Sequence, residues 1–249
     1  MLKKVFESLI YNSITKKIAD YYRNTFQIDF QRNHLLDEIN QNIAKDTYEN
    51  FSSEISSSLL FLTRNKIRNY SISKVLEKSS KDNLFIECGV FEGESINLFA
   101  KKLLEKNYYI HGFDSFEGFD DNWPGSALEK NFFNKEGRLP KVKPNVKLYK
   151  GRVQDTFKEF IDNNNSTIKF LHLDMDHYEP TDYVLKHSKK NLEKGSFILL
   201  DDFANYPGWK NGPYKALNDN IPKNCYLIEA FGIFRSSSVL IRITNPLNE

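Results

Sequence analysis

From residue 84 onward, short apolar runs alternate with longer amphipathic stretches. The apolar runs predict buried strands over 84–88, 108–113, 146–149, 167–173 and 196–200, and the stretches between them predict helices over 94–106, 154–163 and 180–192. This alternation predicts a parallel sheet covered by helices on both faces. Two further runs, 225–230 and 238–244, are joined by a short segment that contains glycine, and they predict a closing antiparallel pair.

Residues 1 to about 80 carry apolar residues three and four positions apart, which predicts helices. The stripes run from Val5 to Tyr22, from Leu35 to Ile43 and from Phe51 to Leu62, and a short helix follows near Ile72. We therefore divide the chain into an N-terminal helical extension (residues 1–80) and an α/β domain (residues 81–249). The extension is expected to serve as a lid or to form a homo-oligomer, because no cluster of titratable side chains in it indicates chemistry.

Composition limits the partners of the chain. Charged residues make up 27% of its 249 residues, the formal net charge is +2, and no concentrated basic face indicates a nucleic-acid partner. No run approaches the roughly 20 apolar residues that a membrane span needs, and the first ten residues lack the features of a signal peptide. The two cysteines, Cys88 and Cys225, are far apart and form no CxxC pair. We expect a cytoplasmic protein that binds neither nucleic acid nor membrane.

A glycine turn follows the first predicted strand of the α/β domain. Gly89 and Gly93 lie between the strand and the next helix, where glycine permits positive φ and lets a ligand approach the main chain. Phe91 occupies the position where a dinucleotide-binding fingerprint has its second glycine, and the chain has no triphosphate-binding loop. Asp114 follows about 20 residues later, the spacing at which an acid reaches a ribose. A nucleoside without phosphates fits best, and S-adenosylmethionine is the common one; the alternative for the turn alone is close packing of strand on helix.

Carboxylates end two neighbouring predicted strands. Asp174 follows one strand, Asp201 and Asp202 follow the other, and we expect the three to converge at the carboxyl edge of the sheet. Because three uncompensated carboxylates resist joint ionisation, a divalent cation is expected among them. All-oxygen ligation suits Mg²⁺, which can also lower the pKa of a bound hydroxyl. The alternative for any one of these aspartates is a helix N-cap or a loop acid.

Other polar and aromatic residues carry weaker signals. His111 and His172 lie inside strands and are interpreted as core histidines, and His177 as a partly exposed loop histidine. Trp123 and Trp209 lie in loops that overhang the same edge, where they either stack on a substrate or pack in the protein. The longest irregular stretch, 115–144, is expected to be functional or mobile.

Together these motifs resemble a known family. The resemblance rests on Phe85–Ser95, on Asp114-Ser-Phe-Glu-Gly118, on Gly151 with Asp155-Thr156, on Leu173-Asp-Met-Asp-His-Tyr-Glu-Pro-Thr181, and on Asp201-Asp202 with Pro207-Gly208. In this order and spacing the chain resembles the class I S-adenosylmethionine-dependent methyltransferases, and among them the macrocin O-methyltransferase group, which acts on deoxysugars of macrolide antibiotics. The resemblance covers about residues 65 to 220, and the first 60 residues match nothing in it.

The resemblance implies a doubly wound, mostly parallel sheet of seven strands with the last strand antiparallel. It implies that residues 81–249 bind S-adenosylmethionine and that Mg²⁺ lies on Asp174, Asp201 and Asp202, with Asp174 also the proton acceptor. The cofactor would be held by Glu87, Gly89, Gly93 and Ser95 at its methionine part, by Asp114 and Ser115 at the ribose, and by Val153, Gln154 and Asp155 near the adenine. The family has no histidine at the position of His177, and its loop after Asp202 differs from this one.

The sequence thus predicts a Mg²⁺-dependent O-methyltransferase. Its acceptor would be a hydroxyl of a sugar or of a glycosylated or polyol small molecule. Two alternatives stay open at this point. One is a methyltransferase of another acceptor class (RNA, protein or a catechol-like phenol). The other is a non-catalytic nucleoside-binding protein on the same fold.

Overall fold

A computed structural model describes residues 17, 34–126 and 128–247 of the chain. The chain divides into two units, residues 1–42 and 43–249, and each is considered by itself. Helix α2 (His34–Ser57) begins in the first unit and ends in the second. The helical stripe predicted from Val5 to Tyr22 lies outside the described residues except for Lys17, which is helical.

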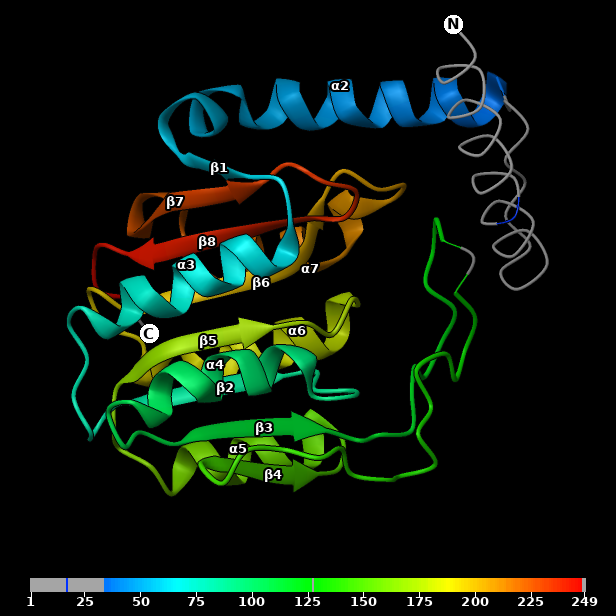
Figure 1. The fold of residues 1–249 in the computed structure, drawn as a ribbon. Helices are drawn as coiled ribbons and strands as arrows, with labels where there is room; N and C mark the ends of the chain where they lie inside the picture. Colours follow the sequence, from blue (N-terminus) through cyan, green and yellow to red (C-terminus); the bar gives the residue numbers. More distant parts are fainter. Residues whose placement is uncertain (1–16, 18–33, 127, 248–249) are drawn as a thin grey trace, which may run out of the picture. The chain divides into compact units, whose positions relative to one another are not determined.

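The second unit contains one mixed sheet, and its strands lie in the order β1-β7-β8-β6-β5-β2-β3-β4 (Figure 1). All neighbours pair in parallel except β8, which is antiparallel to both β6 and β7. The strands are β1 (Leu59–Phe61), β2 (Leu84–Cys88), β3 (Ile110–Asp114), β4 (Val146–Lys150), β5 (Ile168–Leu173), β6 (Phe197–Ala204), β7 (Tyr226–Gly232) and β8 (Ser237–Ile243). The predicted doubly wound sheet with an antiparallel last strand is confirmed.

Strand β1 is an eighth strand that the sequence did not predict. The helical stripe from Phe51 was expected to continue to Leu62, but α2 ends at Ser57 and β1 pairs in parallel with β7. Three consecutive serines at the end of the helix explain the difference, because their hydroxyls bond to main-chain carbonyls one turn back and compete with helical hydrogen bonds. The hydroxyl of Ser58 also donates to the Ile228 carbonyl of β7, at 3.2 Å, and so joins the end of the helix to the sheet.

Helices cover both faces of the sheet (Figure 1). On one face, α3 (Arg64–Leu76) and α4 (Glu94–Leu104) pack into a core with the side chains of that face. On the other face lie α5 (Val153–Asp162), α6 (Tyr178–Ser188) and α7 (Pro213–Asn220). Three short 3₁₀ helices span Lys189–Asn191, Trp209–Asn211 and Lys223–Cys225. Among the described residues, no helix has both the length and the apolar character needed to cross a membrane.

Helix α3 begins close to the carboxyl edge of the sheet. Its N-cap is Thr63, whose side chain accepts a hydrogen bond from the Lys66 N–H. Ile67, Ile72 and Val75 are fully buried against the sheet. Because residues four apart share one helix face, this packing directs both arginines of the first turns, Arg64 and Arg68, toward the same edge.

Phe51 anchors the end of α2 to the second unit. Its ring is 5% exposed and contacts four aromatic rings, those of Phe203, Trp209, Tyr214 and Phe231, at centroid distances of 5.3–5.7 Å. We expect Phe51→Ala to lower the free energy of unfolding by about 3–5 kcal/mol, because it removes a large buried ring. Urea unfolding measures this change.

Tyr48→Ala is the matched control, since Tyr48 lies on the same helix and is 58% exposed. It is expected to change the free energy of unfolding by no more than about 0.5 kcal/mol. Equal losses in the two variants would show that the ring cluster does not anchor the helix.

Candidate active site

A cavity of about 670 Å³ opens at the carboxyl ends of β2, β3, β5 and β6. The residues that follow these strands line it: Gly89 and Val90 after β2, Asp114 and Ser115 at β3, Asp174 to His177 after β5, and Asp202 in β6. Ligands of open parallel sheets bind at this edge. The cavity is therefore the candidate site, at the place that the sequence predicted.

The glycine turn touches the end of β5. Gly89 has φ +89°, and a Cβ added to it would lie 1.8 Å from the main-chain oxygen of Asp174. The Asp174 N–H donates to the Cys88 carbonyl at 2.9 Å, just before the turn. Only glycine permits both this conformation and this approach, so the turn and Asp174 are fixed beside each other.

Asp114 ties the same turn to β3. One of its carboxylate oxygens accepts hydrogen bonds from the N–H groups of Val90 (2.7 Å) and Phe91 (2.8 Å). The other accepts from the Phe116 N–H at 2.6 Å. The carboxylate also lines the cavity, and each oxygen has lone pairs that these bonds leave available to a ligand.

Most of the predicted cofactor-binding residues line the cavity: Gly89, Ser95, Asp114, Ser115, Val153 and Gln154. Glu87, Gly93 and Asp155 do not. Glu87 is fully buried, and its carboxylate accepts from the Ser95 hydroxyl (2.9 Å) and lies 3.1 Å from Nδ1 of His172. Asp155 lies on a separate shallow depression next to α5. The cofactor roles given to these residues stay predictions.

The three predicted metal ligands do not all face the cavity. Asp174 and Asp202 line it together with Asp176, and one carboxylate oxygen from each of the three lies within 4.8 Å of the others. Asp201 does not line the cavity and is grouped instead with His172 and Asp174. Successive side chains of a strand point to opposite faces, which separates Asp201 from Asp202. Asp176 is not among the metal ligands predicted from the sequence, although its Asp-x-Asp spacing to Asp174 is a signal for a shared site.

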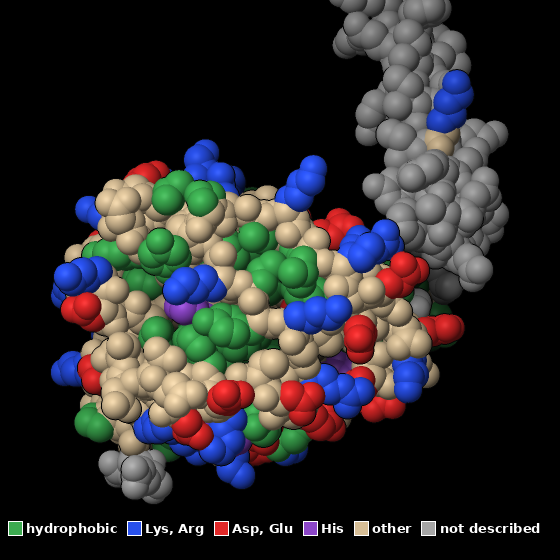
Figure 2. Space-filling view, turned by 90° about the horizontal axis from the view of Figure 1, so that it is seen from below, with side chains coloured by type: hydrophobic (Ala, Val, Ile, Leu, Met, Phe, Trp, Pro, Cys, Tyr) green, Lys and Arg blue, Asp and Glu red, His purple; other side chains and the backbone are tan. Residues whose placement is uncertain are grey.

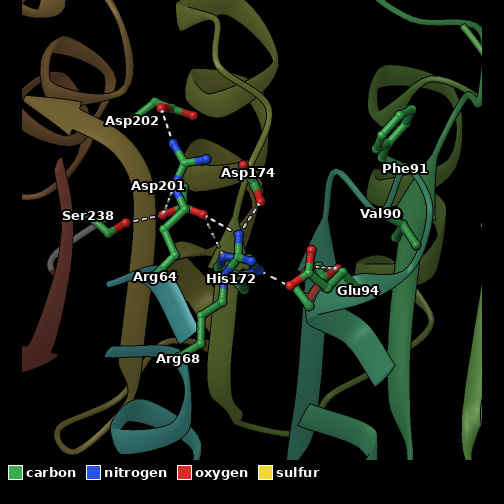
Figure 3. Close-up of polar contacts among 12 residues, drawn as sticks. Arg64, Arg68, Val90, Phe91, Glu94, His172, Asp174, Asp201, Asp202 and Ser238 are labelled. Atoms are coloured by element: carbon green, nitrogen blue, oxygen red, sulfur yellow. Dashed lines mark hydrogen bonds and ion pairs between the residues drawn. The ribbon is translucent and has the colours of Figure 1, made fainter. Parts of the chain in front are cut away.

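Two arginines of α3 neutralise these aspartates (Figure 3). Nη2 of Arg68 lies 2.9 Å from Asp174 and 2.5 Å from Asp201, and Nη2 of Arg64 lies 2.9 Å from Asp202. Residues 1–80 were expected to hold no titratable cluster that indicates chemistry, yet two arginines of this stretch pair with the aspartates of the candidate site. Arginines four apart on a predicted helix were the signal in the sequence, but no pattern there named their partners.

A buried histidine, His172, lies between Glu87 of β2 and Asp201 of β6. His172 is fully buried, with Nδ1 at 3.1 Å from Glu87 and Nε2 at 3.7 Å from Asp201. Burial alone would lower the pKa of His172, but the carboxylates of Asp201 and Glu87 raise it to about 9. The imidazole is therefore cationic at neutral pH. It is a core histidine, as predicted, but a charged one.

Burial sets the charge state of the acidic cluster. Burial and the neighbouring Asp201 raise the pKa of Asp174 to about 8. Burial and Asp202 likewise raise the pKa of Asp176 well above its usual range. Burial also opposes ionisation of Asp201, but His172 and Arg68 outweigh it and hold the pKa of Asp201 well below its usual range. Asp201 is thus a permanent anion, whereas Asp174 and Asp176 need a further cation to ionise together.

The irregular segment 115–144 gives the cavity an aromatic wall. Phe119 stacks on His177 with ring centroids 4.7 Å apart, and Phe133 contacts both Phe91 (4.9 Å) and Phe119 (5.1 Å). Trp123 also lines the cavity, whereas Trp209 is 3% exposed and donates its indole N–H to Asp46 at 3.1 Å. The sequence left open whether each tryptophan stacks on a substrate or packs in the protein. Trp209 packs in the protein interior, and Trp123 lies where it could contact a substrate.

A family model described as "Methyltransferase domain" matches residues 86–203. The fold is similar to the crystal structure of CalS11, described as a calicheamicin methyltransferase, with TM-score 0.60 and 20% identity over 85% of this chain and 94% of that one. An apo structure of CalS11, described as a TDP-rhamnose 3'-O-methyltransferase, gives TM-score 0.54 and 20% identity over 85% and 96% of the two chains. The structure of the O-methyltransferase NovP gives TM-score 0.55 and 19% identity over 73% of this chain and 80% of that one. At such identities the likeness shows the fold. No curated protein matches the chain.

Arg68 is the buried counter-ion of this site. We expect Arg68→Leu to lower the free energy of unfolding by about 3–5 kcal/mol, because it leaves the buried Asp201 without its ion-pair partner. Arg64→Leu is the comparison, since the Arg64 side chain is 42% exposed, and it is expected to cost about 1 kcal/mol or less. Urea unfolding of both variants measures the difference. A loss for Arg68→Leu no larger than that for Arg64→Leu would contradict the role given to the buried pair.

Proposed function

We propose that this chain is a class I S-adenosylmethionine-dependent methyltransferase that methylates a hydroxyl of a sugar or of a glycosylated or polyol small molecule with the help of Mg²⁺. The family-model match and the sheet topology support a methyltransferase. The acceptor and the metal are the finer parts of the proposal. The single observation that carries the proposed methyl transfer is the contact between the glycine turn and Asp174 inside one cavity.

That contact supports methyl transfer because it puts two functions next to each other. S-adenosylmethionine supplies an electrophilic methyl group on a sulfonium. A donor bound along Gly89, Ser95, Asp114, Ser115, Val153 and Gln154 would occupy the wall of the cavity that adjoins the acidic cluster. The sulfonium is a cation, so nearby carboxylates favour binding of the donor more than they favour the transition state, in which its charge is being lost. The rate would then come mainly from alignment of oxygen, methyl carbon and sulfur.

The acidic cluster fits a divalent cation. Five carboxyl groups (Glu87, Asp174, Asp176, Asp201 and Asp202) lie among three cationic side chains (Arg64, Arg68 and His172), so ionisation of all five would leave negative charge uncompensated. Burial resists joint ionisation of Asp174 and Asp176. Oxygen ligands suit Mg²⁺, and the cavity-facing set Asp174, Asp176 and Asp202 would hold it; Asp201, the third ligand predicted from the sequence, would support them from behind. Bound Mg²⁺ would lower the pKa of the acceptor hydroxyl.

Asp174 is the proposed proton acceptor. It lines the cavity beside the glycine turn, and the Arg68 guanidinium holds one of its oxygens at 2.9 Å. Without a further cation, burial and Asp201 raise the pKa of Asp174 and favour its protonated form. Bound Mg²⁺ would let Asp174 ionise, as a proton acceptor must. Its place next to the donor turn gives the proton an acceptor where the hydroxyl would react.

The charge of the cavity bears on the acceptor. Carboxylates outnumber arginines among its lining residues, which favours a neutral hydroxyl compound over a polyanion. Figure 2 shows Lys and Arg side chains interspersed with Asp and Glu on the face seen from below, and no broad basic surface is visible there. An RNA acceptor is therefore disfavoured. The aromatic wall of Phe119, Trp123 and Phe133 offers apolar surface to a sugar ring. The structures with the same fold include one described as acting on TDP-rhamnose, so nucleotide sugars belong in the test.

Donor binding is the first test. S-adenosylmethionine is expected to bind in a calorimetric titration, and Asp114→Ala to weaken it at least roughly 10-fold, because the carboxylate both orders the glycine turn and faces the ligand. Asp162→Ala is the control, since Asp162 is an exposed residue at the end of α5. Unchanged affinity in Asp114→Ala would remove Asp114 from the donor site, and no binding by the unaltered protein would end the proposal.

Metal-dependent methyl transfer is the second test. Radiolabelled methyl groups are expected to enter a member of a panel of glycosides and nucleotide sugars in the presence of Mg²⁺, and a chelator is expected to abolish the transfer. Asp202→Asn should reduce this transfer strongly while leaving donor affinity largely intact, because Asp202 lies in the acidic cluster and not on the donor turn. Chelator-insensitive transfer would eliminate the metal from the proposal.

A further inference from the structure

The methionine end of the donor carries an ammonium and a carboxylate, and the residue predicted to meet it is occupied elsewhere. Glu87 is fully buried and does not line the cavity. Its two oxygens are taken by the Ser95 hydroxyl and by His172. Moving Glu87 toward a ligand would break its contacts with Ser95 and His172 and leave those buried polar groups without this partner, which is costly. Another acid must therefore receive the ammonium.

Glu94 is placed to receive it. It lies in the first turn of α4, directly after the glycine turn, and its exposed side chain lines the cavity. In Figure 3 it lies between the pair Arg68 and His172 and the turn that carries Val90 and Phe91. Its carboxylate accepts a 3.3 Å hydrogen bond from the Asn65 amide, and no ion pair of Glu94 occurs within the described part of the chain. Its carboxylate can therefore bind a cation at the cost of, at most, one long hydrogen bond.

The other acids on this wall are already engaged. Glu92 pairs with Lys135 at 2.6 Å. Asp114 accepts three main-chain N–H groups, and the lone pairs that remain are assigned to the ribose of the donor. Glu94 is thus the carboxylate of the glycine turn that can take a new cationic partner without breaking an existing ion pair.

Arg68 supplies the opposite charge. Its side chain lines the cavity although the residue is only 7% exposed, and Nε has no hydrogen-bond partner among the described residues. Nη2 makes both of its contacts with the aspartates. A guanidinium carries five N–H donors, and these two contacts of Nη2 leave others for a ligand carboxylate.

We propose that Glu94 binds the α-ammonium of S-adenosylmethionine and that Arg68 binds its α-carboxylate. The two side chains form a pair of opposite charges that matches the zwitterionic end of the donor, and they lie on elements from different parts of the chain, α4 and α3. This inference rests on the proposed use of S-adenosylmethionine. It adds a donor-binding role for two residues that sequence patterns did not single out.

The test compares ligands with and without the amino-acid end. S-adenosylhomocysteine carries it, and 5'-methylthioadenosine lacks it. In calorimetric titrations, Glu94→Gln is expected to weaken S-adenosylhomocysteine roughly 10-fold, the effect of losing one charge-assisted hydrogen bond, and to leave methylthioadenosine unchanged. Glu92→Gln and Glu105→Gln remove one negative charge nearby and at the far end of α4, and neither should change the ratio of the two affinities.

Arg68 is tested with the ligand changed as well as the protein, because the variant also loses contacts to the aspartates. Arg68→Lys is expected to weaken S-adenosylmethionine by several-fold but not decarboxylated S-adenosylmethionine. Equal weakening of both ligands would overturn the role of Arg68. For Glu94, an unchanged affinity for S-adenosylhomocysteine, or equal weakening of methylthioadenosine, would overturn the inference. Failure of the unaltered protein to bind any of these ligands would instead overturn the proposed function.

Discussion

The buried ion network around Asp201 is the constraint on which the rest of the site depends. Asp201 is almost completely inaccessible, and it holds Arg68 and His172 while accepting a hydrogen bond from the Ser238 hydroxyl. Through Arg68 it reaches Asp174, and through His172 it reaches Glu87 and Ser95. Groups from α3, β2, α4, β5, β6 and β8 are thereby joined by ion pairs and hydrogen bonds at the middle of the sheet. Such a network is costly to break at any one member, since the remaining charges stay buried.

The network also explains why Asp201 and Asp202, adjacent in sequence, have different surroundings. Asp201 is the buried anion that pairs with Arg68 and His172. Asp202 has φ +48° and lines the cavity, at a point where the pairing of β6 with β8 is irregular. The acids that face the cavity, Asp174, Asp176 and Asp202, are then placed to contact a ligand. Asp201 thus has a structural role, whereas Asp174, Asp176 and Asp202 are in position to bind a ligand.

The sequence predicted the parts of this protein that local pattern controls. The ends of β2, β3, β5 and β6 follow from apolar runs that stop at glycine or aspartate, and those ends fix the edge where the cavity lies. Strand β1 could not be predicted, because three residues at the end of a helical stripe carry no period of their own and acquire a strand conformation only by pairing with β7. The partners of Arg64 and Arg68 lie more than 100 residues away in sequence, so no local pattern contains them.

The placement of α3 has a consequence for what counts as the methyltransferase unit. The matched region begins at residue 86, yet the arginines that neutralise its aspartates lie on a helix that ends at Leu76. A fragment limited to the matched region would keep the acids and His172 but lose both arginines. Helix α3 is therefore an electrostatic component of the site. Transplanting this sheet with its strand-end motifs into another protein would transfer the recognisable motifs without the charge balance that lets them fold together.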